Sequence, residues 1–198
     1  AECFGIKAGK NKLFSTLYQK AMEGDKDCGG MIACNYYSGE PVTGLEEGRP
    51  MFLRRPDSHL GLANFMRSHL YASLATLKIG LDILLKEEDV KIDSITGHGG
   101  LFKTKGVGQS ILAAAMNAPI SVMETAGEGG AWGMALLAAY MLSKKDGQSL
   151  GDYLDSRVFA ERKSETMEPD LADVAGFETY TKQYQACLAA EKAAVQAF

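Results

Sequence analysis

The sequence has few of the features that mark membrane or nucleic-acid-binding proteins. Its longest apolar run, Ala131–Leu142, covers twelve residues, whereas a membrane-spanning helix needs about 20. The 21 Lys and Arg residues form no continuous basic stripe, and the formal net charge is -4. We therefore expect a cytoplasmic protein that has neither a membrane nor a nucleic acid as its partner.

Cysteine and histidine are also scarce. Four cysteines occur, none of them in a Cys-x-x-Cys pair, and the chain has three histidines. Zinc sites need ligands at closer spacing, so no metal-ligating residue is predicted. The cysteines are expected to be buried or free thiols in a reducing cytosol; they are Cys3, Cys28, Cys34 and Cys187.

The hydrophobic pattern predicts helices that alternate with short strands. The most regular helix follows Asp57 or Ser58, either of which is expected to cap it, and has leucines at three- and four-residue steps as far as Leu85. Ser38–Pro56, with three prolines, is expected to be irregular. This order predicts an α/β fold. The other expected elements are a helix within residues 1–24, an extended segment 29–37, strands 90–96 and 120–123, helices 106–117 and 131–144, and a helical remainder with helices near 150–154 and over 172–197.

A glycine-rich stretch between a predicted strand and a predicted helix is the main candidate for chemistry. It reads Ile95-Thr-Gly-His-Gly-Gly-Leu-Phe-Lys-Thr104 and contains neither GxxxxGK[ST] nor GxGxxG. Glycines here let a main chain approach a ligand, and the next helix would offer free N–H groups to an anion. A plain tight turn explains the glycines equally well. Lys103 and Lys105 either contact a phosphate or are exposed loop lysines.

The apolar helix predicted over residues 131–144 is rich in small side chains. Such residues allow a helix to lie close to a neighbouring element, so internal packing is expected, and a role at an interdomain hinge is the alternative. Trp132 is expected in the core, although its ring could also stack on an adenine.

Taken together, these segments resemble the C-terminal domain of the FGGY family of carbohydrate kinases. The resemblance runs from about residue 30 to 185. It rests on the order of several motifs rather than on any single one. They are Tyr37–Pro41, Gly99-Gly100, Gln109–Ala113, Asn117–Ile120, Glu128, Gly133–Ala138 and the helix Phe177–Tyr184.

This resemblance implies an actin-like ATPase (ribonuclease H-like) domain, with a mixed sheet and flanking helices, that is the second domain of a two-domain kinase. It implies ATP and Mg²⁺ as cofactors, with most of the Mg²⁺ coordination coming from the nucleotide and the other domain. Gly99 and Gly100 would lie against the α-phosphate and ribose, and Leu101 and Thr104 near the adenine. Gly97 and Lys103 complete the expected nucleotide site, and His98, Leu101 and Lys103 depart from the usual family pattern.

The resemblance also implies that half of the kinase is missing. In the family, the Asp that takes the proton from the sugar hydroxyl lies in the N-terminal domain. No Asp here matches it, and Asp93 is expected to be a solvated strand residue. We interpret residues 1–198, which begin with Ala, as one C-terminal kinase domain with a helical extension from about residue 150.

The parent protein is expected to phosphorylate a sugar, and a pentulose such as xylulose or ribulose is the preferred candidate. This chain alone is expected to be inactive. The alternative is a non-catalytic actin-like module for nucleotide binding or assembly. Expected partners are ATP, a sugar held by the absent domain, and a second copy of the chain in a homodimer.

Overall fold

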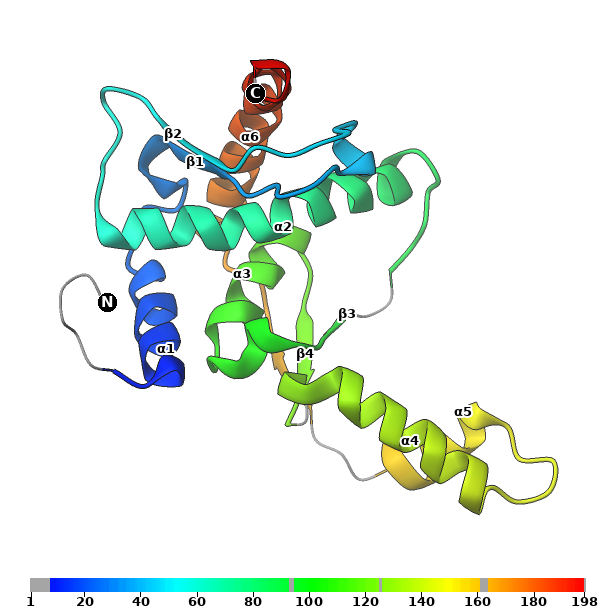
Figure 1. Ribbon diagram of the computed structural model, residues 1–198. Helices are drawn as coiled ribbons and strands as arrows, with labels where there is room; N and C mark the ends of the chain where they lie inside the picture. Colours follow the sequence, from blue (N-terminus) through cyan, green and yellow to red (C-terminus); the bar gives the residue numbers. More distant parts are fainter. Residues whose placement is uncertain (1–7, 93–94, 125, 161–163, 198) are drawn as a thin grey trace.

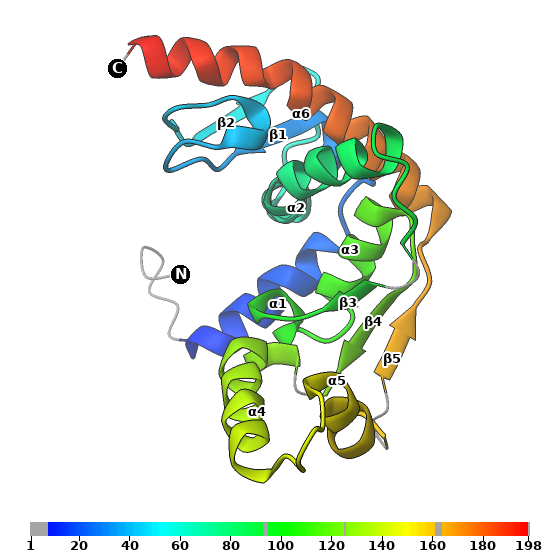
Figure 2. The ribbon, with the colours of Figure 1, turned by 90° about the vertical axis from the view of Figure 1, so that its right-hand side faces the viewer.

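The computed structural model describes residues 8–92, 95–124, 126–160 and 164–197. Its elements are arranged as two small sheets with helices packed between and around them (Figures 1 and 2). The helices are α1 (Lys10–Ala21), α2 (Leu62–Lys86), α3 (Val107–Met116), α4 (Gly129–Ser143), α5 (Leu150–Tyr153) and α6 (Leu171–Ala197). The strands are β1 (Met31–Cys34), β2 (Met51–Arg54), β3 (Ile95–Gly97), β4 (Ile120–Met123) and β5 (Ser164–Met167). Within these ranges, no helix is long and apolar enough to cross a membrane.

The first sheet is an antiparallel pair that is held between two long helices. In the register of β1 and β2, Met31 lies opposite Arg54 and Cys34 opposite Met51. Every residue of β1 is buried, because α2 and α6 both pack against this strand (Figure 2).

The second sheet has the order β3-β4-β5 and carries the glycine-rich loop. Strands β3 and β4 are parallel, and β4 and β5 are antiparallel. Helix α3 makes the connection between the two parallel strands and is buried along nearly its whole length, between the sheet and helices α2 and α6. Asn117, in the left-handed conformation with φ of 48°, ends this helix.

Aromatic side chains of α2 and α6 fill the centre of the core. The rings of Tyr71 and Phe177 lie 4.6 Å apart, and those of Tyr71 and Tyr180 lie 5.3 Å apart. The Tyr180 hydroxyl donates to the Ser68 carbonyl oxygen at 3.0 Å, so this buried polar group has a partner. Helix α6 therefore belongs to the core, although it lies beyond residue 150.

The structure confirms most of the predicted helices and corrects three details. Two strands were not predicted: β2 lies in the stretch expected to be irregular, and β5 lies in the remainder expected to be helical. Neither Asp57 nor Ser58 caps α2, which begins after Gly61 without a side-chain cap. The Ser58 hydroxyl instead donates to the Gly30 carbonyl oxygen at 2.8 Å.

Strand β3 is described from Ile95 onward, and Asp93 lies outside the described residues.

Helix α4 corrects a further expectation, because it does not pack into the core. None of its residues is buried, and with α5 it forms an arm at the edge of the molecule (Figure 1). Trp132 is half-buried rather than central, and its ring lies 6.0 Å from that of Phe159. Gly133, one of the small residues that suggested close packing, has open space beside it: a β-carbon placed there would meet nothing within 4 Å.

Candidate functional site

The glycine-rich loop turns sharply at the carboxyl end of β3. Gly99 has φ of 110° and ψ of -175°, a conformation that a residue with a β-carbon rarely adopts. A short 3-10 turn, Gly100–Lys103, follows, and Gly106 with φ of 80° leads into α3. Gly99 and Gly106 thus supply the two positive-φ positions on either side of the turn between the strand and the helix.

The main chain at Gly99 and Gly100, the tip of this loop, has open space beside it. A β-carbon placed on Gly99 or on Gly100 would meet nothing within 4 Å. Gly97 differs, because a β-carbon there would collide with the ring of Phe102. Gly97 is therefore required for packing inside the loop, whereas the main chain at Gly99 and Gly100 is open to an approaching molecule.

A cavity of about 360 Å³ lies between this tip and helix α1, and we call it the α1 cavity. From the loop, Gly100, Lys103 and Thr104 line it. Helix α1 contributes two aromatic rings and two polar side chains, so the lining suits a flat, partly polar ligand. The four α1 residues are Asn11, Phe14, Ser15 and Tyr18.

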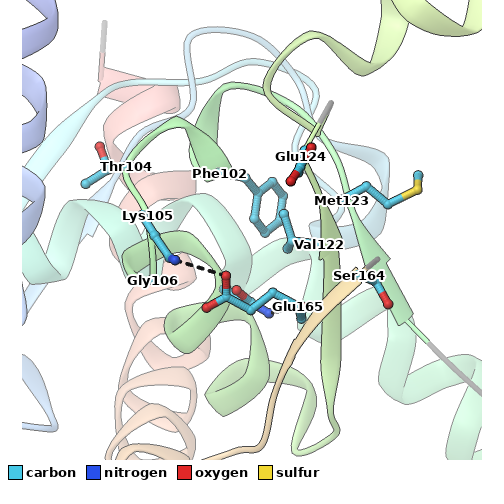
Figure 3. Close-up of a pocket in the computed structure, with 10 residues that line it drawn as sticks. Phe102, Thr104, Lys105, Gly106, Val122, Met123, Glu124, Ser164 and Glu165 are labelled. Atoms are coloured by element: carbon cyan, nitrogen blue, oxygen red, sulfur yellow. Dashed lines mark hydrogen bonds and ion pairs between the residues drawn. The ribbon is translucent and has the colours of Figure 1, made fainter. Parts of the chain in front are cut away.

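A second cavity, of about 410 Å³, lies on the β5 side of the loop, and we call it the β5 cavity (Figure 3). Thr104 lines both cavities. In the β5 cavity, Lys105 is already paired with Glu165, with 3.1 Å between Nζ and Oε2, and Glu124 adds a second carboxylate. Two carboxylates repel a phosphate, so the β5 cavity suits an anion less well than the α1 cavity does.

A third cavity, of about 390 Å³, is lined mainly by apolar side chains of α2, α3 and β3. Gly97, Leu101 and the exposed His98 lie along it. Gly97 and Leu101, both predicted to contact nucleotide, therefore face a different cavity from Gly100, Lys103 and Thr104. Leu101 also packs against the core, and its carbonyl oxygen faces Gly108 at the start of α3.

The contribution of α1 was missed by sequence reasoning. The helix was predicted, but its pattern does not indicate which distant loop it faces. The sequence carries no signal for this role, because the exposure of Phe14, 46%, is visible only in the structure. Helix α1 is positioned by its contacts with α2.

The family model for the C-terminal domain of the FGGY family of carbohydrate kinases matches residues 4–142 of the chain. The chain belongs to this family. The FGGY family model thus includes both the glycine-rich loop and helix α1, the two walls of the α1 cavity. No curated protein sequence matches the chain at a significant level.

Several solved kinases share the fold of this FGGY domain. Xylulose kinase from Rhodospirillum rubrum is 18% identical, with a TM-score of 0.62 over 89% of this chain and 33% of that chain. Ligand-bound xylulose kinase from Lactobacillus acidophilus is 18% identical, with a TM-score of 0.66 over 89% of this chain and 35% of that one. Plasmodium falciparum glycerol kinase with ADP is 18% identical, with a TM-score of 0.60 over 90% of this chain and 33% of that chain. The chain thus spans about one third of the length of these kinases.

Proposed function

We propose that this chain is the ATP-binding half of a carbohydrate kinase that transfers the γ-phosphoryl group of MgATP to a sugar hydroxyl. The observation that carries the proposal is the bare main chain at Gly99 and Gly100 beside the α1 cavity. Two glycines with open space in front of them allow a ribose and a phosphate to touch the main chain directly. Membership of the FGGY family supports the same reaction class.

Each part of the nucleotide has a counterpart in the α1 cavity. The rings of Phe14 and Tyr18 offer apolar surface to an adenine, and Thr104 offers a hydroxyl. Lys103 offers an ammonium group to the phosphates. No carboxylate of the described residues lines this cavity, so we propose that Mg²⁺ is held mainly by the phosphates and by the rest of the kinase.

We propose a pentulose such as xylulose or ribulose as the sugar. Xylulose kinases are among the proteins of similar fold. Gluconate and glycerol kinases also share the fold, so gluconate and glycerol are further candidate substrates. The sugar site and the catalytic base would lie in the part of these kinases that the chain does not span. Phosphoryl transfer depends on positioning both substrates, so the chain alone should not catalyse it.

The first test is titration calorimetry with ADP on the chain and on Gly100→Val. The wild-type chain should bind weakly, in the micromolar range or above, because one domain encloses only part of the ligand. The valine should weaken binding about tenfold or more by filling the approach to the main chain. Gly133→Val on α4 is the matched control, since that position is equally open and lies on another element.

Two results would contradict the proposal. Unchanged ADP binding in Gly100→Val would mean that the loop is only a turn. Sugar-dependent release of ADP by this chain alone, in a coupled assay with xylulose or ribulose, would mean that the catalytic base is present here.

A further inference from the structure

Lys103 lies at the α1 cavity and also forms an ion pair with Glu128, a residue that does not line the cavity. It lines that cavity with Gly100 and Thr104. At the same time its Nζ lies 2.6 Å from Oε1 of Glu128, the residue just before α4. One lysine thus connects the proposed nucleotide site with the start of the α4 arm.

The ion pair is held in place by the segment that precedes α4. The aliphatic part of Lys103 lies beside Gly127, where an added β-carbon would come within 3.2 Å of Cγ. Glycine at this position leaves room for the lysine to extend toward Glu128. The Lys103–Glu128 pair thus connects the loop to the segment Ala126–Glu128, which also lies beside the aliphatic part of the lysine.

The pair is also easy to break. Its side chains are 56% and 75% exposed, and ion pairs this open to water stabilise a protein only slightly. A nucleotide phosphate carries more charge than one carboxylate and offers several oxygens to an ammonium group. A phosphate in the α1 cavity would therefore compete well for Lys103.

We infer that Glu128 competes with the nucleotide phosphates for Lys103. The lysine pairs with Glu128 when the cavity is empty and turns to a phosphate when ADP or ATP binds. This inference rests on the proposed function, because it requires the nucleotide to occupy the α1 cavity. It adds a regulatory consequence: binding of nucleotide removes the ion pair between the loop and Glu128, while Gly129 at the start of α4 stays packed against His98 of the loop.

The test compares ADP with adenosine, which has no phosphate, in titration calorimetry of the whole chain. Lys103→Met should weaken ADP binding about three- to tenfold and leave adenosine binding unchanged. Glu128→Gln should strengthen ADP binding about two- to threefold, because the competitor is gone. In the double variant, Glu128→Gln should have no further effect.

Lys105→Met and Glu165→Gln are the matched controls, because this exposed pair lies at the β5 cavity. Neither control should change ADP binding by as much as Lys103→Met does. Equal weakening of ADP and adenosine by Lys103→Met would show a structural effect and overturn the inference. So would a Glu128→Gln variant that binds ADP no better than wild type. If neither ligand binds the wild-type chain, the proposed function itself is wrong, and the inference falls with it.

Discussion

His69 lies on α2 beside two phenylalanine rings that also contact each other. Its ring is 6.1 Å from that of Phe52 and 4.5 Å from that of Phe65. This partly buried, aromatic surrounding lowers the pKa of His69, because burial disfavours the charged imidazolium. The folded protein therefore binds a proton at His69 less readily than the unfolded chain does.

A pH dependence of stability follows from this lowered pKa. The unfolded histidine has a pKa of about 6.5, so the contribution of neutral His69 is fully present above that pH. It is lost as the pH falls from about 6.5 through the lower pKa of the folded state. We expect the free energy of unfolding in urea to fall more between pH 7.5 and pH 5.5 for wild type than for His69→Gln. Parallel pH profiles for the two proteins would contradict this prediction.

At the scale of residues, the sequence pattern located the loop but not the whole cavity. Gly99 and Gly100 could be singled out, because glycines between a strand and a helix have a recognisable physical use. Lys103 was a candidate as a cation beside them, and Thr104 followed only from the family resemblance. Phe14 and Tyr18 could not, since their place beside the loop depends on how α1 packs on α2. Nucleotide binding by all of these residues stays a prediction.

At the scale of elements, one buried arginine connects three helices. Arg67 of α2 is almost fully buried and pairs with Asp173 of α6. Its Nη2 donates to the Tyr71 hydroxyl at 2.8 Å, and its Nη1 lies 3.5 Å from carbonyl oxygens at the end of α1 and just after it. Lys26 also reaches Asp173, with 2.8 Å between Nζ and Oδ1. Arg67 thus fixes the end of α1, the helix that forms one wall of the α1 cavity.

Removing this arginine should be costly. Among the described residues, Arg67→Met leaves the buried Asp173 with Lys26 as its one remaining charged partner, and breaking a buried pair in this way costs about 3–5 kcal/mol. Urea denaturation gives the measurement. Lys20→Met is the control, since its exposed pair with Glu23 should contribute at most about 1 kcal/mol. A loss for Arg67→Met no larger than that of the control would show that the buried pair adds little.

The elements that the sequence did not indicate are those made by tertiary pairing. Strand β2 lies between Pro50 and Pro56, so its local pattern favours a loop, and it becomes a strand because β1 pairs with it. Strand β5 is polar and mostly exposed, so no apolar alternation marks it, and its pairing with β4 alone defines it. In contrast, the apolar residues that α2 and α3 bury recur at helical spacing within each segment, so the sequence of the segment alone predicts the helix.

At the scale of the whole molecule, the fold leaves a large apolar surface on the α4 arm. A helix that is apolar all round is normally buried, yet no side chain of α4 is. The largest exposed side chains here are Met134, Leu137, Met141 and Leu142. The prediction of internal packing failed because it assumed a neighbouring element that covers α4, and no other element of the described residues buries it.

We expect this uncovered apolar helix to make the chain self-associate, and the homodimer therefore stays a prediction that the helix allows to be tested. Contact between two such helices would remove Met141 and Leu142, 76% and 91% exposed, from water. We expect light scattering after gel filtration to show a mass that rises with concentration, and Met141→Ser with Leu142→Ser to return it toward one chain. Leu171→Ser is the control, because Leu171 is 79% exposed at the start of α6. A wild-type chain that stays monomeric at every concentration, or a control variant equally effective, would show that α4 does not drive association.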